Sequence, residues 1–265
     1  MGAQGGKNPL SVINYAWRLL ITGFNFILFG VGGVLLSVAL YFVSHLIPMS
    51  SDRKLALIRG AISRTLSIYI LFLRLCGLLS YEIHGHEHLK PGGQLIIANH
   101  PSLLDVAFLI SLVRKVNCVV KASLWHTPLT QTPVSMAKYI RNDSKQLIQD
   151  CIESLHSGDS LIIFPEGTRT PPGVPLRFHR GVANVALLAK NDITPITIRC
   201  EPAALLKSQK WYQIPQRAPH YTIQILPNIA IEPYLAMEGM QSQKARRLNR
   251  DLMEFFTTRI DTQGD

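Results

Sequence analysis

The chain has 265 residues, of which 47% are hydrophobic and 17% are charged, and its formal net charge is +10. This composition excludes a disordered chain, because such chains are poor in apolar residues, and it suits one good-sized globular domain plus an apolar segment. The basic balance suits an anionic partner. Charge alone leaves open whether that partner is nucleic acid, an anionic lipid surface or an acidic carrier protein.

An uncharged apolar segment runs from residue 19 to residue 47, with no Lys, Arg, Asp or Glu. A membrane-spanning helix needs about 20 mainly apolar residues, so the segment predicts a transmembrane or deeply embedded helix. Its glycines disfavour a helix in water but are frequent in membrane helices. Two alternatives remain. One is a buried helix of a soluble core, for which the run is long. The other is a cleaved signal peptide, for which no small-x-small cleavage site follows.

Positive charge is heavier after this segment than before it. The side of a membrane helix that is richer in Lys and Arg usually faces the cytoplasm. We therefore expect an inner (cytoplasmic) membrane protein whose remaining chain is cytoplasmic. Lys7 and Arg18 precede the segment, and the basic residues that follow it are Arg53, Lys54, Arg59 and Arg64.

Residues 56–79 combine apolar side chains with Arg59, Arg64 and Arg74. This pattern predicts one or two amphipathic helices at the membrane surface, with the arginines reaching the headgroups. An ordinary helix packed on the following domain fits equally well. A second span would have to bury Arg74 deeply, which is costly.

After Tyr81, short apolar strands alternate with helical patterns. Such alternation predicts an α/β fold, with a mixed, largely parallel sheet flanked by helices and preceded by the membrane helix and the amphipathic helices. We expect residues 1–80 to form a membrane-anchoring helical region and residues 81–265 the second domain. The expected strands are 94–98, 116–120, 160–164, 193–199 and 221–226, and the expected helices are 103–114, 144–156, 182–190 and 240–260.

Histidines and cysteines predict no metal site. His84, His86 and His88 alternate as strand ligands would, but no thiolate or clear carboxylate partner follows at a matching spacing. Partly exposed histidines before the first core strand are the favoured interpretation. The four cysteines are not closely spaced, which predicts buried, reduced thiols.

The first segment with a chemical pattern is Asn99-His100-Pro101-Ser102, followed by Asp105. A neutral imidazole can take the proton of a hydroxyl as that hydroxyl attacks a thioester. A carboxylate on the other ring nitrogen fixes the tautomer and stabilises the imidazolium. His100 and Asp105 are therefore a candidate base and its orienting acid. Ser102 and Asp105 also fit a helix-capping pattern, and both interpretations can hold together.

The second segment, Glu166-Gly167-Thr168-Arg169, follows a predicted strand. Gly167 allows close approach of the backbone to a ligand, and exposed amides, the Thr168 hydroxyl and the Arg169 guanidinium can hold a phosphate. Glu166 could bind an acceptor hydroxyl or fix Arg169. A surface turn with an internal Glu–Arg pair is the plain alternative. Further candidates for the same anion are Lys121, Arg141, Arg177, His179 and Arg180.

Together, in this order and at this separation, the two segments resemble the glycerolipid acyltransferase family, which includes lysophosphatidic acid acyltransferases of the PlsC type. The first segment matches the family's first motif, and Phe164-Pro165 with residues 166–169 matches its third. Thr194-Pro195-Ile196 resembles its fourth, and residues 178–181 resemble the stretch between the two. The resemblance covers about residues 82–226 and implies that His100 is the base, that Asp105 orients it, and that residues 166–169 bind the acceptor.

By the same resemblance, Arg141 corresponds to the arginine of the second motif. The chain departs from the family there, because Met136-Ala137-Lys138 stands where a glycine is usual. Since that motif helps to hold the acceptor phosphate, the departure bears on which acceptor is used. The N-terminal apolar helix and the run Trp211-Tyr212-Gln213-Ile214-Pro215 are more typical of a branch that serves acyl-carrier-dependent lipid or polyene pathways.

The resemblance implies an O-acyltransferase with acyl-CoA or acyl carrier protein as co-substrate and no other cofactor. Its partners would be a lipid acceptor and the membrane, with no nucleic acid. The rival hypotheses are an acyltransferase of a specialised acyl-carrier-dependent pathway, a non-catalytic lipid-binding protein on the same fold, and a hydrolase in which water replaces the acceptor.

Overall fold

The computed structural model describes residues 9–113 and 115–262. Within them, seven strands form one sheet in the order β1-β7-β6-β2-β5-β3-β4. Only the β6–β7 pair is antiparallel, and the other five neighbouring pairs are parallel. The strands are β1 Ser80–His84, β2 Leu95–Ala98, β3 Val116–Val120, β4 Ile140–Arg141, β5 Ser160–Ile163, β6 Ile193–Glu201 and β7 His220–Ile225. The predicted mixed, largely parallel sheet is confirmed.

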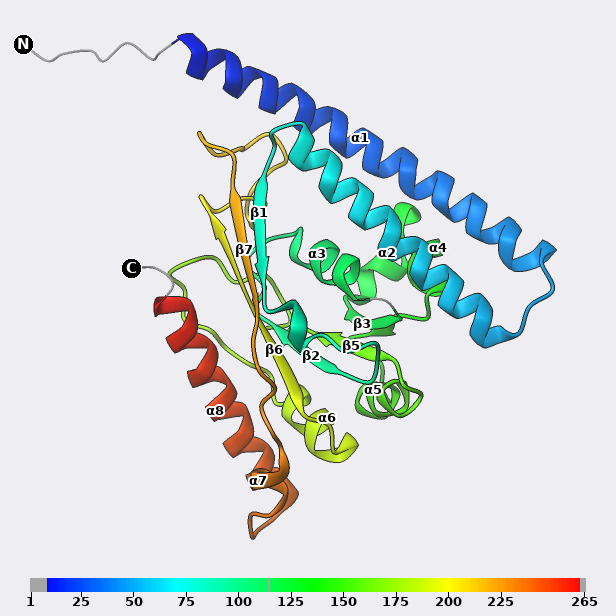
Figure 1. Ribbon diagram of the computed structural model, residues 1–265, viewed down its shortest axis with the longest axis vertical. Helices are drawn as coiled ribbons and strands as arrows, with labels where there is room; N and C mark the ends of the chain where they lie inside the picture. Colours follow the sequence, from blue (N-terminus) through cyan, green and yellow to red (C-terminus); the bar gives the residue numbers. More distant parts are fainter. Residues whose placement is uncertain (1–8, 114, 263–265) are drawn as a thin grey trace, which may run out of the picture.

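Helices cover both faces of this sheet (Figure 1). The first face carries α2 Ser51–Leu75, α3 Asp105–Leu112 and α4 Pro128–Met136, with α1 Pro9–Leu46 running along its outside. The second face carries α5 Leu147–His156, α6 Gly181–Ala189 and α8 Gln241–Thr262, with the short α7 Glu232–Leu235 beside α8. Two 3-10 turns, η1 His86–His88 and η2 Ala122–Trp125, complete the described elements.

The central strands are buried on both faces, which explains their unbroken apolar sequences. In β2, Leu95 and Ile97 point into the core of the second face, whereas Ile96 and Ala98 point into that of the first. This is the period of two that a strand imposes on its side chains. Only a sheet covered by helices on both sides can bury all four of these residues.

Several predicted boundaries were wrong. The helix expected from residue 103 begins at Asp105 and ends at Leu112, because residues 102–104 form the turn that leads into it. The helix expected from residue 144 begins at Leu147. Helix α4 was not predicted, since Pro128 and Pro133 both lie within it and prolines usually mark breaks. The histidine run does not continue as a strand: β1 ends at His84, and His86–His88 form a 3-10 turn.

The two N-terminal helices are both long and apolar enough to cross a membrane, a property that some core helices of soluble proteins share. In place of the predicted surface helices of residues 56–79, one continuous helix, α2, begins at Ser51 and packs against α3. Six residues of α2 are buried, among them the arginine Arg59. The alternative of a helix packed on the domain therefore describes α2 better.

Arg59 ties α2 to the domain through a buried ion pair. Its Nη1 lies 2.6 Å from Oδ2 of Asp159, and its Nε donates a 2.9 Å hydrogen bond to the Ala137 carbonyl. The arginine side chain is 3% exposed and that of Asp159 is 22% exposed. Burying a guanidinium is costly unless it is paired, so this contact restricts how α2 can sit on the sheet.

Asp159→Asn is expected to lower the free energy of unfolding by about 3 kcal/mol, because it leaves the buried Arg59 charge unpaired. Chemical denaturation in detergent would measure this. Arg59→Met combined with Asp159→Asn should recover most of the loss. Asp143→Asn is the matched control, because Asp143 is paired with an arginine at the surface and should change stability little. Equal effects of Asp159→Asn and Asp143→Asn would contradict the structural role of the buried pair.

Candidate functional site

The candidate site lies where β2 and β5 end, at the same edge of the sheet. The two strands are parallel neighbours, with Ile97 opposite Ile163. The loops that follow them therefore begin side by side, and they carry His100 and Glu166. Sites of open α/β sheets form at the carboxyl ends of the strands, where helix and strand connections leave a crevice.

Asn99 fixes the point at which the chain leaves β2. Its Nδ2 donates to the Ile198 carbonyl at 2.8 Å, and its Oδ1 accepts from the Ile198 amide at 2.7 Å. The side-chain amide thus takes the place of a backbone pairing with β6. The backbone is released from the sheet at this residue, and the next residue, His100, is turned towards β5.

His100 and Asp105 form the predicted pair. His100 Nδ1 lies 2.8 Å from Asp105 Oδ2, which also accepts a 2.7 Å hydrogen bond from the Ser102 amide. The Asp105 side chain is fully buried, whereas that of His100 is 14% exposed. The imidazole ring stacks on Phe164 with 4.3 Å between ring centroids. Since the carboxylate engages Nδ1, the other nitrogen, Nε2, is the one available to a substrate hydroxyl.

Asp105 also accepts the hydrogen bond from the Ser102 amide that the capping pattern predicted, but Ser102 is not the N-cap, because α3 begins at Asp105 and its N-cap is Leu104. The Ser102 hydroxyl does not complete the capping box. It donates to the Ala204 carbonyl and lies 2.8 Å from the Tyr221 hydroxyl. Burial raises the pKa of the Asp105 carboxyl, and the hydrogen bonds from His100 and Ser102 oppose that rise. The same carboxylate therefore shapes the loop and orients the imidazole.

Glu166 binds the histidine loop directly. Its Oε1 accepts a 2.7 Å hydrogen bond from the His100 amide. The Thr170 amide in turn donates to the His100 carbonyl at 2.9 Å. The internal Glu166–Arg169 pair considered above is not what holds this turn, because Arg169 Nη1 donates instead to the Leu205 carbonyl at 2.6 Å.

The turn after β5 requires its glycine. Gly167 has φ +66°, and a Cβ there would lie 3.2 Å from the His179 ring. Thr168 is exposed beside it. The His179 amide donates to the Pro165 carbonyl at 2.8 Å, so the predicted stretch before α6 folds back onto this turn. His179 thus lies next to residues 166–169, as a candidate for the same anion should.

Lys121 and Arg141 lie at the same edge of the sheet but farther along it. They stand at the ends of β3 and β4, and β5 separates β3 from β2. With about 5 Å between neighbouring strands, the end of β3 is about 10 Å from that of β2. Arg141 is paired with Asp143 through Nε and Nη2, at 3.0 and 2.9 Å. The structure thus places Arg141 on the correct edge with its guanidinium already engaged.

Three partners of the site were missed from the sequence. Phe164 stacks on His100, Thr170 bonds the histidine loop, and Tyr221 reaches Ser102 from β7. Thr170 follows the recognised motif directly and gave a signal that could have been used. Tyr221 gave none, because only the pairing of β7 with β6 brings it near. No group of His, Cys, Asp and Glu suited to a metal ion occurs among the described residues.

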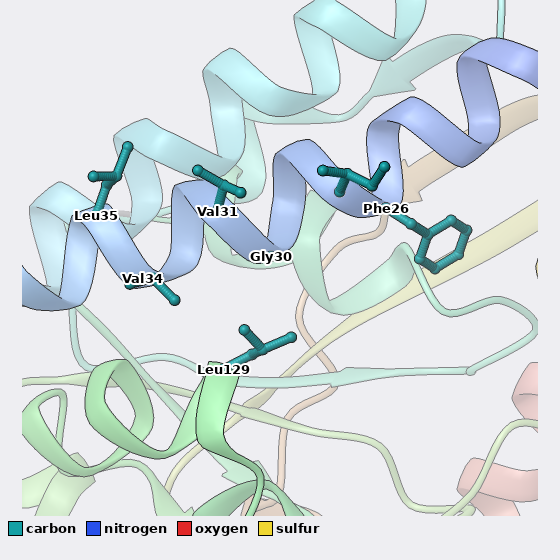
Figure 2. Close-up of a pocket in the computed structure, with 7 residues that line it drawn as sticks. Phe26, Gly30, Val31, Val34, Leu35 and Leu129 are labelled. Atoms are coloured by element: carbon teal, nitrogen blue, oxygen red, sulfur yellow. The ribbon is translucent and has the colours of Figure 1, made fainter.

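An apolar hollow lies away from His100. It has a volume of about 370 Å³ and is lined by Leu129 of α4 and by residues of α1 between Phe26 and Leu35 (Figure 2). All of its lining residues are apolar or glycine. It therefore belongs to the surface of α1 and supplies no chemistry to the candidate site.

Glu166→Gln is expected to change how stability depends on pH. Burial raises the pKa of the Glu166 carboxyl above its unfolded value, so the folded protein holds the proton more tightly. Stability from this group is therefore present below its unfolded pKa of about 4.3 and is lost as pH rises towards the folded pKa. Denaturation at a series of pH values should show Glu166→Gln gaining stability, relative to the parent protein, as pH rises. A difference between the two proteins that stays constant with pH would contradict this expectation.

The model of the acyltransferase family, described as "Acyltransferase", matches residues 80–199. The spacing of His100 and Asp105 is characteristic of this family. A 1-acyl-sn-glycerol-3-phosphate acyltransferase of Pseudomonas aeruginosa is 30% identical over 125 residues, which are 44% of this chain and 49% of the relative. A lyso-ornithine lipid O-acyltransferase of the same organism is 34% identical over 131 residues, which are 47% of this chain and 50% of the relative. The chain thus spans about half the length of these curated relatives.

Among solved structures, the crystal structure of the acyltransferase PlsC from Thermotoga maritima aligns with a TM-score of 0.59 and 16% identity. The alignment covers 86% of this chain and 97% of that one, so it supports the fold over more than the matched domain. The family match, the relatives and the fold agree with the geometry of the two loops. Residues 80–199 therefore match the acyltransferase family model, and the same region resembles curated glycerolipid acyltransferases.

Proposed function

We propose that the chain is a membrane-bound O-acyltransferase. It would move an acyl group from acyl-CoA or acyl carrier protein to a hydroxyl of a lysophospholipid or related lipid. The observation that carries the proposal is the 2.8 Å contact between His100 Nδ1 and Asp105 Oδ2, in a loop whose backbone bonds the buried Glu166. The names of the relatives support a lipid acceptor of this class.

In the proposed reaction, His100 Nε2 takes the proton of the acceptor hydroxyl as its oxygen attacks the thioester carbonyl. The carbon–sulfur bond breaks when the tetrahedral intermediate collapses. The proton passes from the imidazolium to the leaving sulfur, which departs as a thiol. Asp105 keeps Nδ1 protonated and stabilises the imidazolium in between. Arg169, Gly167 and Thr168 lie beside the pair, where they would bind the acceptor, and Lys121 and Arg141 would extend the basic edge.

We further propose that α1 lies flat in one leaflet. The helix is 38 residues long, which at about 1.5 Å per residue exceeds the hydrocarbon core of about 30 Å. Near its first end Arg18 bonds the Pro215 carbonyl, and near its second end Lys54 Nζ bonds the Ser44 carbonyl at 2.6 Å. The first end is thus tied to the segment after β6 and the second end to α2, which packs against α3, so both ends belong on the same side of the bilayer. We infer that this is the cytoplasmic side of the inner membrane.

His100→Ala is expected to lower the rate of acyl transfer by at least about 100-fold, because a general base contributes about 10²–10⁴. The protein should remain folded and membrane-bound. Thiol release and mass spectrometry of the lipid product would measure this, with acyl-CoA and acyl carrier protein offered separately. The acceptor panel would include lysophosphatidate and lyso-ornithine lipid. His156→Ala, an exposed histidine at the end of α5, is the control.

Undiminished transfer by His100→Ala would refute the mechanism. Free fatty acid as the only product would instead identify a hydrolase, and lipid binding without thiol release would identify a non-catalytic protein. Each of these outcomes replaces the proposal with a named rival.

The orientation of α1 can be tested with an epitope tag at the N-terminus. Membrane vesicles would be treated with a protease that cannot cross the bilayer. A flat α1 keeps the tag on the same side as the domain, so both should be digested together in inverted vesicles. A tag that is protected where the domain is digested would show that α1 crosses the bilayer.

A further inference from the structure

The segment that joins β6 to β7, residues 202–219, runs beside α1 and carries the run Trp211-Tyr212, to which the catalytic proposal gives no role. Trp211 packs against α1: its ring lies 6.3 Å from that of Phe26 by centroid, and a Cβ at Gly23 would lie 3.2 Å from its ring. Tyr212 meets Trp211 edge-on, with 5.6 Å between ring centroids. Gly23 thus makes room for Trp211 on the surface of the helix.

Arg18 fixes the far end of this segment to α1. The guanidinium donates to the carbonyls of both Pro215 and Gln216, and its Nε bonds Asn14 within the helix. Although it is an arginine, Arg18 is only 3% exposed. A charged group buried in this way holds its partners firmly, since releasing them would leave it unpaired. The Trp211-Tyr212 run is therefore held against the helix at a defined position.

Both aromatic side chains nevertheless remain about half exposed, at 49% for Trp211 and 45% for Tyr212. Phe26, which Trp211 contacts, is itself exposed on α1, and the helix also carries a row of exposed apolar residues that contains Leu20, Phe24 and Ile27. These positions share one helix face, because residues three and four apart are neighbours. The aromatic pair thus extends the apolar surface of α1 sideways and does not form a separate patch.

Positive charge surrounds the same aromatic pair. Lys207, Lys210 and Arg217 are exposed in the segment, and Lys210 Nζ lies 5.8 Å from the centroid of the Tyr212 ring. Trp and Tyr are enriched at the level of lipid headgroups, where an apolar ring with a polar edge is most stable. Nearby lysines and arginines add attraction to anionic lipids.

We propose that Trp211 and Tyr212 insert into the headgroup–acyl boundary of the bilayer, as a second membrane contact beside α1. The inference rests on the proposed membrane-bound function and goes beyond it by assigning a surface and its ligand. The ligand is a lipid bilayer, with Lys207, Lys210 and Arg217 facing anionic headgroups.

The proposed membrane contact is connected to the candidate site, because the segment of residues 202–219 begins beside the histidine loop. The Ala204 carbonyl accepts from the Ser102 hydroxyl at 3.0 Å, and the Leu205 carbonyl accepts from Arg169 Nη1 at 2.6 Å. One end of the segment therefore holds the histidine loop and the arginine, while the other end is held by α1. A bilayer that binds Trp211 would therefore hold His100 and Arg169 at a fixed distance from the lipid surface.

The test uses the fluorescence of the full-length protein, which has three tryptophans. Trp17→Phe with Trp125→Phe leaves Trp211 alone, and Trp17→Phe with Trp211→Phe leaves Trp125, the matched control inside the domain. Vesicles of phosphatidylglycerol and phosphatidylethanolamine would carry lipids brominated at different depths. Trp211 emission should shift to the blue and be quenched most by the shallow bromines, whereas Trp125 emission should not change.

Binding supplies the second measurement. Trp211→Ala with Tyr212→Ala should weaken vesicle binding about tenfold, because two interfacial aromatic anchors are lost. Leu188→Ala, a half-exposed apolar residue of α6 on the other face of the sheet, should leave binding unchanged. The proposal is wrong if vesicles leave Trp211 emission unchanged and iodide in solution still quenches it, even where acyl transfer is intact. Neither the emission nor the binding measurement depends on acyl transfer, so this test stays valid even if the catalytic proposal is refuted.

Discussion

The hydrogen bond from the His100 amide to Glu166 joins the two loops on which the candidate site depends. Each loop follows a central strand of the sheet, and each would be free to turn away from the other. Asn99 releases the first loop from the sheet at a fixed residue, and Thr170 bonds the same loop from the second side. The carboxylate that orients His100, Asp105, is then presented from the first residue of α3. The polar contacts of Asn99, Asp105, Glu166 and Thr170 thus determine where the imidazole lies.

This arrangement changes the meaning of Glu166. A glutamate in this motif, which matches the third motif of the family, invites a role in binding the acceptor, yet here one of its oxygens is committed to the backbone of the histidine loop. Its Oε2 is buried without a hydrogen-bond partner, as is Oδ1 of Asp105. Two buried carboxylate oxygens of this kind, beside a histidine, are unusual in a site that serves only as a structural joint, because buried polar groups are normally bonded. They are consistent with a site that is completed by its substrate.

The position of the two N-terminal helices depends on two buried arginines. Arg59 binds α2 to the domain through Asp159 and the Ala137 carbonyl, and Arg18 binds α1 to the segment after β6. Both use the guanidinium to join backbone carbonyls that are far away in the sequence. The apolar helices are therefore parts of one packed structure, and the candidate site and the exposed apolar surface of α1 keep a fixed relation. That fixed relation is what the proposed membrane-bound acyl transfer would need.

The sequence by itself determined the α/β class, the central strands, the His100–Asp105 pair and the resemblance to the acyltransferase family, because strand period and local spacing carry these features. Local patterns could not show that Asp105 both bonds the Ser102 amide and orients His100, that Arg141 is engaged by Asp143, or that α2 packs on the sheet. The structure also decided the place of Arg18, which charge counting treated as a flank of a membrane helix, and of Trp211, which had no assigned role. The places of Arg18 and Trp211 depend on contacts between residues almost 200 positions apart, and the strand order that creates those contacts cannot be read from any one segment.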